Sequence, residues 1–386
     1  MEGCRMIGKI ADNIISPLGM TTEENYMAVK RGDSRLVRYE GLWDIPEPFC
    51  ASLFTESQWE DLSLEGEYTR FERMLIHSIA QALSQTDVDA SSQRVLFIVS
   101  TTKGNIELLD SRTPSFVHRD AGKALELADA ALHISRYFHN ENTPVVASNA
   151  CISGLSAQIA AVRAIASGRY DTVVVAGADV QSRFIVSGFQ SFKAVSQEPC
   201  RPFDIDRCGL NLGEAAATLI YSRIPESAEG ESWLTEAGAV RNDGFHISNP
   251  SRTAEGCFRA LSHVMEYCRK EDLALVNVHG TSTLYNDEME AVALRRARLS
   301  EVPVNSLKGY YGHTMGAAGI LETILAMRAV DGGVVLGTKG FEELGVSCKV
   351  NISKDNRPTD RRSFIKLISG FGGGNAAILF RKGGSR

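Results

Sequence analysis

The chain has 386 residues, of which 44% are hydrophobic and 23% are charged, and its formal net charge is -6. The length allows one large or two medium α/β units, and the composition is typical of a globular enzyme. The negative charge argues against a general nucleic-acid binder, which would usually carry a basic surplus. The N-terminal stretch MEGCRMIGKIADNI lacks a long apolar core, and no run approaches membrane-spanning length. We therefore expect no membrane insertion and a cytoplasmic location.

The eight cysteines are scattered along the chain, and no two of them stand at C-x-x-C spacing. This distribution argues against a structural zinc site and against a small disulfide scaffold. We expect reduced thiols and no metal centre.

Apolar runs and stretches of helical periodicity alternate along the chain. In chain order we expect a helix near 69–84, a strand over 94–101, a helix near 121–138, a strand over 143–148, a helix near 152–167, a strand over 171–179, a helix near 254–269, a strand over 273–280 and a helix near 316–330. Continuous apolar strands separated by helices are typical of βαβ units, and they predict a mostly parallel sheet covered on both faces. The predicted fold class is α/β.

Two glycine-rich segments resemble each other, GLNLGEAAATLIYSR at 209–223 and GFGGGNAAILFRK at 370–382. Each runs from a glycine-rich turn through alanines into an apolar strand that ends in basic residues. Chance similarity of two glycine-rich hairpins is one interpretation. An internal repeat is the other, and it predicts two similar halves, residues 1–230 and residues 231–386.

Cys151 stands where the strand over 143–148 gives way to the helix near 152–167. A helix N-terminus carries partial positive charge and unpaired N–H groups, which lower the energy of a thiolate and can hold an oxyanion. A nucleophilic cysteine is therefore one interpretation. The other is a small hydrophobe in an alanine-rich buried helix, and this segment alone favours it.

Two histidines occupy comparable junctions later in the chain. His279 follows the apolar run LALVNV, and His313 precedes a helix start rich in small residues, after a loop that holds Lys308. In α/β folds the ends of strands carry the ligand-binding loops. Each histidine alone is typical of a structural residue, but two of them together with a cysteine form a constellation suited to acyl transfer.

The chain contains, in this order, the segments SNACISG, RPFDIDRCGLNLGEAAA, HGTST, LKGYYGHTMGAAG and GFGGGN. In this order and at this spacing they resemble the β-ketoacyl-acyl-carrier-protein synthases of the elongating type. The resemblance covers the chain from about residue 90 to the last residue, with a weaker match before that. It implies the thiolase fold, in which two pseudo-equivalent βαβ halves form a five-layer αβαβα arrangement.

The resemblance also implies roles for individual residues. Cys151 would be the nucleophile that accepts the acyl group, and His279 and His313 would assist decarboxylation and condensation. Lys308 would support the histidines electrostatically, with Glu322 as its partner.

The glycine-rich segment near the C-terminus carries further implied roles. Phe371 would gate the site, and its backbone N–H would join that of Cys151 in an oxyanion hole. The implied substrate-binding residues are Thr281, Thr283 and Gly372. GFGGGN has a glycine where the family pattern has threonine or serine, which predicts a looser gate.

The implied reaction is a decarboxylative Claisen condensation of an acyl thioester with malonyl-acyl-carrier protein. Its product is a 3-oxoacyl-acyl-carrier protein, made in fatty-acid synthesis or in specialised polyketide or polyene synthesis. Because loss of carbon dioxide drives the condensation, we expect no cofactor.

Two alternative functions stay open. One is a non-catalytic subunit that resembles a chain-length factor and pairs with an active homologue, and the presence of Cys151 argues against it. The other is a cysteine-dependent hydrolase of acyl thioesters. Its weakness is that neither histidine has an obvious carboxylate to orient it, although Asp287 or Glu322 could serve.

The implied partner is an acyl-carrier protein, and the implied assembly is a homodimer, with a heterodimer left open. Carrier proteins are acidic and this chain is net negative, so docking requires a local basic patch. Arg70 and Arg73 stand at i, i+3 spacing on one predicted helix and offer such a patch. A solvated helix face, paired to Glu67 or Glu72, is an equal alternative.

Overall fold

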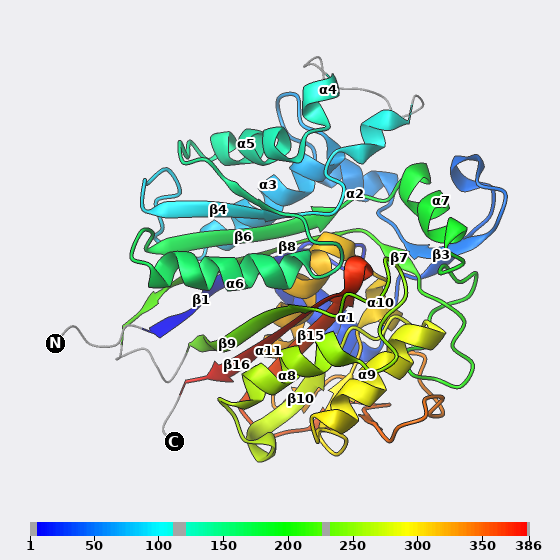
Figure 1. The fold of residues 1–386 in the computed structure, drawn as a ribbon. Helices are drawn as coiled ribbons and strands as arrows, with labels where there is room; N and C mark the ends of the chain where they lie inside the picture. The colour runs from blue at the N-terminus through cyan, green and yellow to red at the C-terminus, as the bar shows by residue number, and fades with distance from the viewer. Residues whose placement is uncertain (1–5, 111–120, 226–231, 384–386) are drawn as a thin grey trace.

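The structure is a computed structural model that describes residues 6–110, 121–225 and 232–383. Layers of helices and strands alternate from top to bottom in Figure 1, in the order helices, strands, helices, strands, helices. Separate apolar clusters fill the spaces between successive layers. The predicted α/β class and the five-layer arrangement are confirmed.

Eleven strands of the described residues form one continuous sheet. Their spatial order is β13 (Asn351–Ile352), β11 (Pro303–Asn305), β10 (Leu273–Asn277), β15 (Ser363–Gly370), β16 (Gly374–Lys382), β9 (Trp233–Asn242), β1 (Met6–Ile15), β8 (Ala215–Ile224), β6 (Thr172–Asp179), β4 (Val95–Ser100) and β5 (Val145–Ala147). The contact between β1 and β9 is short, with Gly8 opposite Leu234 and Lys9 opposite Trp233. It joins a part of six strands, from β13 to β9, to a part of five strands, from β1 to β5. The two parts pack on opposite sides of a central helical layer.

The expectation of a mostly parallel sheet is wrong for the middle of the sheet. The outer pairs, such as β4 with β6 and β10 with β15, are parallel, but every pair from β6 through β8, β1, β9 and β16 to β15 is antiparallel. Only the residues 371–373 join β15 to β16, with Gly370 opposite Gly374. A parallel pair needs a long crossover, so a connection this short forces the antiparallel pairing.

The helices of the outer layers cover the two outward faces of the sheet. α3 (Arg70–Leu83) and α5 (Leu127–Tyr137) cover one face, and α8 (Glu255–Met265) and α9 (Leu284–Arg296) cover the other (Figure 1). The predicted helix at 121–138 is divided into α4 (Ala121–Ala124) and α5. At the start of α3 the Thr69 side chain accepts from the Glu72 N–H, and the Glu72 carboxylate accepts from the Thr69 N–H, which fixes that helix start.

The central layer consists of α6 (Ser153–Ala166) and α11 (Ala318–Asp331), and both are largely buried. Strand β15 packs against helices on both of its faces. Phe364 and Ile368 pack in the cluster toward α6 and α11, whereas Ile365 and Leu367 pack in the cluster toward α8 and α9. Successive side chains of a strand point to opposite faces, so a strand buried on both faces reads as a continuous apolar run.

The two parts of the sheet have matching strand orders. β5, β4, β6, β8 and β1 on one side correspond to β11, β10, β15, β16 and β9 on the other. The segments that resemble each other in sequence end in β8 and β16, which occupy equivalent places. The predicted boundary between residues 230 and 231 lies within 226–231, outside the described residues, so the division at that point stays a prediction.

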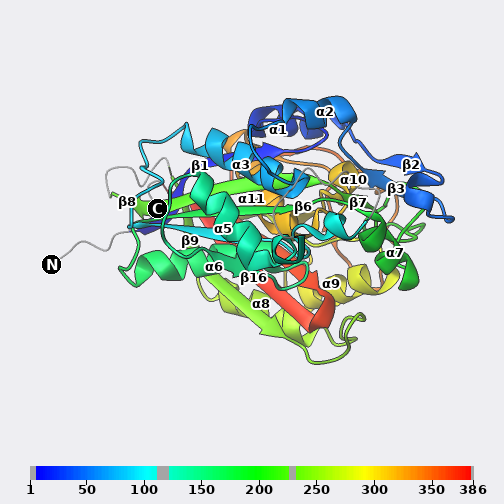
Figure 2. The same ribbon diagram turned by 90° about the horizontal axis from the view of Figure 1, so that it is seen from above.

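The remaining elements are short or peripheral: α1 (Thr22–Arg31), β2 (Val37–Tyr39), β3 (Phe49–Ser52), α2 (Glu56–Asp61), α7 (Arg183–Ser191), β7 (Leu212–Gly213), α10 (Lys308–Tyr311), β12 (Val334–Val335) and β14 (Arg357–Pro358). Figures 1 and 2 both place α7, α9, α10 and β3 at one end of the molecule. Within the described ranges no helix has both the length and the apolar character needed to cross a bilayer.

Candidate active site

A cavity of about 330 Å³ is lined in part by residues of α7 and α9. Its lining comes from both parts of the sheet and includes Cys151, His279, Thr281, Thr283, His313 and Phe371. The structure therefore brings together residues that are far apart in the sequence.

Cys151 lies in the short connection between β5 and α6, directly before the first turn of the helix. The preceding residue, Ala150, has φ of 45°, in the left-handed region that non-glycine residues rarely adopt. The hydroxyl of Ser153 holds this bend, because it donates to the Ala150 carbonyl and accepts from the Asn149 N–H. The thiol is only 7% exposed and faces the cavity.

The electrostatic environment of the thiol differs from the simple expectation for a helix start. Burial raises the pKa of Cys151, and the positive charges of Lys308 and Lys103 and the backbone N–H of Phe371 offset only part of this effect. Desolvation thus outweighs the favourable helix end in the free protein.

Two backbone N–H groups point at the Cys151 sulfur, its own and that of Phe371. A glycine at position 370 suits this approach, because a Cβ there would make a tight contact, 3.1 Å from the backbone nitrogen of Cys151. Paired N–H groups beside a nucleophile are the arrangement that stabilises a tetrahedral oxyanion. The two N–H groups that the resemblance names therefore lie together, and their role as an oxyanion hole stays a prediction.

The Phe371 ring packs among aromatic residues that sequence reasoning missed. Its centroid lies 5.7 Å from that of Phe189 and 5.5 Å from that of Phe192, at the end of α7. All three rings line the cavity. Phe371 therefore belongs to an aromatic cluster to which α7 contributes, and its role as a gate stays a prediction.

His279 follows the end of β10 and is held through its backbone. The Glu290 carboxylate on α9 accepts from the N–H groups of His279 and Gly280, both at 2.7 Å. Burial, together with the nearby Asp287, raises the pKa of Glu290 to about 7. Sequence reasoning missed Glu290, which stands in none of the motifs quoted above. The one signal in the sequence is its position one helix turn after Asp287.

His313 is held through its ring. The Met315 N–H donates to Nδ1 of His313 at 3.3 Å, so the neutral imidazole carries its proton on Nε2. Nε2 of His313 and Nδ1 of His279 are both buried and have no hydrogen-bond partner among the described residues. Burial, followed by the charge of Lys308, holds the pKa of both histidines well below the usual range, so both rings are neutral at physiological pH.

The thiol of Cys151 and the imidazole nitrogens of His279 and His313 lie within 4.8 Å of one another. A substrate carbonyl placed between them would meet a nucleophile on one side and neutral N–H donors on the other. Such an arrangement can form an acyl thioester and can stabilise an enolate.

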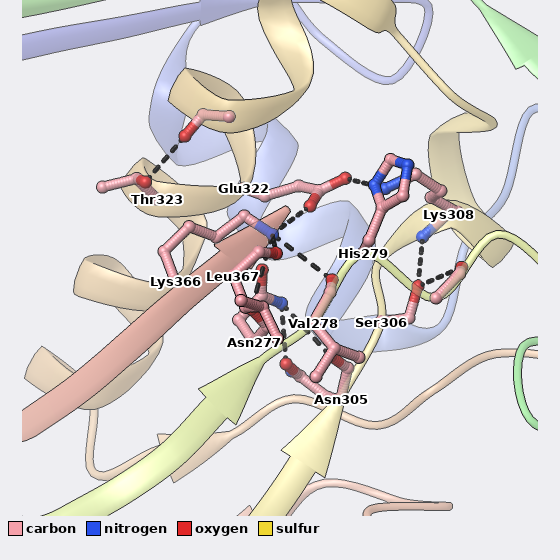
Figure 3. A network of polar contacts seen from close by, with 12 residues as sticks. Asn277, Val278, His279, Asn305, Ser306, Lys308, Glu322, Thr323, Lys366 and Leu367 are labelled. Atoms are coloured by element: carbon pink, nitrogen blue, oxygen red, sulfur yellow. Dashed lines mark hydrogen bonds and ion pairs between the residues drawn. The ribbon is translucent and has the colours of Figure 1, made fainter. Parts of the chain in front are cut away.

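Lys308 and Glu322 lie together behind the histidines, as the sequence predicts. The Lys308 ammonium donates to Oε1 of Glu322 at 2.8 Å, and both side chains are almost completely buried. A second lysine, Lys366, pairs with Oε2 of the same carboxylate at 2.6 Å (Figure 3). Burial alone would raise the pKa of Glu322, but the two lysines lower it. Sequence reasoning missed Lys366.

The predicted substrate-binding residues differ in their placement. The hydroxyls of Thr281 and Thr283 lie 2.9 Å apart in the cavity wall. Gly372 is not among the described residues that line the cavity, since its N–H donates to the Ile247 carbonyl and its own carbonyl accepts from Asn242. Its role in binding substrate stays a prediction.

Arg70 and Arg73 lie outside the cavity lining, at the start of α3. Arg70 pairs with Glu56 of α2 at 3.1 Å and lies over the Trp59 ring. Arg73 donates to the Tyr68 carbonyl. Both side chains are partly exposed, and docking of a carrier protein on them stays a prediction.

Comparisons with known proteins identify the family of this chain. The N-terminal domain of the beta-ketoacyl synthase family matches residues 18–225, and its C-terminal domain matches residues 235–342. Nodulation protein E of Rhizobium leguminosarum bv. trifolii is 28% identical over 66% of this chain, and the match spans 65% of that protein, just under two thirds of its length. The 3-oxoacyl-[acyl-carrier-protein] synthase 2 of Rhizobium meliloti (strain 1021) is 26% identical over 96% of this chain and 97% of its own length.

Solved structures show the same architecture. A beta-ketoacyl synthase from Burkholderia phymatum STM815 has a TM-score of 0.86 and 25% identity, over 98% of this chain and 99% of that one. A chain of the complex between the ketosynthase ApeO and its chain length factor ApeC, from Xenorhabdus doucetiae, has a TM-score of 0.85 over 99% of both chains. Its identity is 22%, so this likeness concerns the fold alone. Taken with the matches that span its length, these findings show that the chain belongs to the beta-ketoacyl synthase family.

Proposed function

We propose that this protein catalyses the decarboxylative Claisen condensation of an acyl thioester with a malonyl thioester carried by an acyl-carrier protein. The observation that carries the proposal is the convergence of one buried thiol and two neutral imidazoles within 4.8 Å in a single cavity. A hydrolase or a simple thioester exchanger would need only one of the two imidazoles.

In the first half-reaction the Cys151 sulfur attacks the acyl carbonyl of the incoming thioester. The new bond joins Sγ to the carbonyl carbon, the carrier sulfur leaves, and the proton of the Cys151 thiol ends on that leaving sulfur. The N–H groups of Cys151 and Phe371 would hold the oxyanion of the tetrahedral intermediate. The acyl group is then stored on Cys151.

In the second half-reaction the carbon–carbon bond to the malonyl carboxylate breaks and carbon dioxide leaves. The electron pair of that bond forms a thioester enolate, whose oxygen would accept from Nε2 of His313 and from the His279 ring. The enolate carbon attacks the acyl carbonyl on Cys151. The thiolate that is expelled takes a proton from solvent, and the 3-oxoacyl thioester stays on the carrier.

We propose that no metal, nucleotide or redox cofactor takes part. The release of carbon dioxide supplies the driving force for the new carbon–carbon bond, and no step of the cycle changes an oxidation level at the protein. Neutral imidazoles suit this chemistry, because they donate hydrogen bonds to the enolate without quenching it by proton transfer.

The proposed substrate carrier is an acyl-carrier protein, in line with the name of the relative 3-oxoacyl-[acyl-carrier-protein] synthase 2. For the assembly we propose a homodimer, with a pair formed with a homologous subunit as the alternative that the ApeO–ApeC complex suggests. A cytoplasmic location belongs to the same proposal.

The hydrolase alternative lacks the carboxylate it would need. The Asp287 carboxylate accepts from the Phe203 N–H and the Asn286 amide, and Glu322 is held by two lysines. Within the described residues neither the His279 imidazole nor the His313 imidazole has a carboxylate partner, since Glu290 bonds only the backbone N–H of His279. The non-catalytic alternative would leave the buried Cys151 thiol without a role.

One experiment separates the three functions. The protein is incubated with acyl-carrier and malonyl-carrier, and mass spectrometry measures the adduct on Cys151, the carrier-bound product and any free acid. The proposal predicts an acyl adduct and a 3-oxoacyl product. Free acid as the main product would favour the hydrolase, and the absence of both adduct and product would favour the non-catalytic subunit.

A further inference from the structure

Lys366 occupies a position in the sheet where an apolar side chain is expected. It lies on β15 between Phe364 and Ile368, and with them it faces the central helical layer. The side chain is completely buried. Lysine is almost never fully buried unless it is paired, so its presence in this layer calls for a partner and a reason.

The partners of Lys366 belong to the site described above. Its ammonium pairs with Oε2 of Glu322 at 2.6 Å and donates to the carbonyls of Val278 at 3.3 Å and Leu367 at 3.1 Å. Val278 directly precedes His279 in the chain. Figure 3 shows Lys366 pointing at the strand end that carries His279 and at the carboxylate that also holds Lys308.

We propose that Lys366 is a positioning residue for the decarboxylation step, which joins the backbone beside His279 to the Lys308–Glu322 pair and adds a positive charge behind both histidines. The proposal rests on the function proposed above. Lys308 and Glu322 by themselves form a neutral pair. With Lys366 the group carries one net positive charge, which lies next to the place where the enolate oxygen becomes negative.

The charged groups around Lys366 are few and all belong to this network. Burial lowers the pKa of Lys366 to about 8, an effect that Lys308 reinforces and that Glu322 and Glu290 oppose. The charge of Lys366 in turn contributes to the lowered pKa of His279 and of His313. Removal of this charge should therefore raise the pKa of both imidazoles.

Two variants test the proposal in the full-length protein, Lys366→Met and Lys366→Gln. The first removes both the charge and the hydrogen bonds, and the second keeps a donor for the carbonyls but no charge. We expect both to accept an acyl group on Cys151 as the wild type does. Carbon dioxide release from malonyl-carrier should fall by roughly 10- to 100-fold, with the smaller loss in Lys366→Gln. The acid limb of the release rate should move to higher pH in both.

Lys382→Met is the matched control. Lys382 lies on the neighbouring strand β16 and pairs with Asp331 at the end of the same helix α11, but it is partly exposed and is not among the residues that line the cavity. Its loss removes a lysine–carboxylate contact between sheet and helix without changing the charge beside the histidines. We expect its rate of carbon dioxide release and its pH profile to match those of the wild type.

The outcomes separate this inference from the proposed function. A wild type that forms no adduct and releases no carbon dioxide would contradict the function itself. An active wild type with unchanged rates and pH profiles in both Lys366 variants would overturn the role of Lys366 alone. An equal change in the rate and pH profile of Lys382→Met would also overturn it. If both Lys366 variants failed to fold while Lys382→Met folded, Lys366 would serve the core only, and the proposal would again be overturned.

Discussion

His279 and His313 lie edge to face, with their ring centroids 5.0 Å apart and an angle of 81° between the ring planes. The Met315 N–H donates to Nδ1 of the His313 ring, whereas the Glu290 carboxylate holds His279 through its backbone N–H. Nε2 of His313 and Nδ1 of His279 are buried and have no hydrogen-bond partner among the described residues. This relationship places donors where an enolate oxygen would form.

Replacement of either histidine should separate the two half-reactions. In His313→Ala the N–H donor to the enolate is lost, and we expect carbon dioxide release from malonyl-carrier to fall by about 100- to 1,000-fold. Cys151 should still accept an acyl group, because its oxyanion donors are backbone groups. Parallel measurement of the adduct mass and of carbon dioxide checks this. Equal loss of both half-reactions would contradict the assigned role.

The rate of decarboxylation should depend on pH through two different groups. The pKa of His313 is lowered by burial and by Lys308, so the rate should stay level on the acid side until well below pH 6.5. Protonation of Nδ1 would then break the bond from Met315 and turn the ring. On the alkaline side the rate should fall near pH 8, where Lys366 loses its proton. A profile measured in Cys151→Ala excludes titration of the thiol, and a rate that rises through pH 8 would contradict this account.

Trimming of Phe371 should change loading more than stability. The ring is partly exposed and contacts Phe189 and Phe192, so Phe371→Ala should cost less than the roughly 3–5 kcal/mol typical of a core phenylalanine. The backbone N–H at position 371 remains, and acylation of Cys151 should continue with poorer discrimination between acyl and malonyl groups. A large fall in melting temperature with unchanged selectivity would show a packing residue. Phe192→Ala, which removes one neighbour of the gate, should show a weaker change in the same direction.

Charge reversal of Arg70 and Arg73 tests the docking surface. If a carrier protein binds there, the double variant should have a higher KM for acyl-carrier and an unchanged KM for short pantetheine thioesters. The loss of the exposed Arg70–Glu56 pair should cost no more than about 1 kcal/mol of stability. Lys349→Glu, which breaks an exposed pair with Glu301 on the opposite part of the sheet, is the control. The same effect on both kinds of substrate would exclude docking at α3.

Local pattern was enough to predict the helices and the parallel strands. α3, α6 and β6 begin and end within one residue of the expected ranges, because their apolar periodicity is uninterrupted and no stronger contact competes with it. The antiparallel strands in the middle of the sheet were harder to predict from the sequence. β1 and β9 mix polar and apolar residues, and both partners of β1, which are β8 and β9, lie more than 200 residues away in the sequence.

The site residues also divide into those that sequence motifs predict and those that only the structure reveals. The resemblance to the synthase motifs pointed to Cys151, His279 and His313, because each of them stands within one of the short motifs of this chain. Lys366 and Glu290 have no such motif, and their importance follows only from three-dimensional contacts with the backbone of residues 278–280. Lys366 interrupts the apolar run of β15, so the sequence pattern predicted neither that strand nor its buried lysine.

The most direct test of the account compares wild-type protein with Cys151→Ala in one assay. Intact-protein mass spectrometry records the acyl adduct while carbon dioxide release from malonyl-carrier is measured on the same samples. Because the thiol holds the acyl group and the histidines act on malonyl, we predict that Cys151→Ala forms no adduct and no condensation product but still releases carbon dioxide. An acyl adduct that persists in Cys151→Ala would place the nucleophile elsewhere and contradict the account.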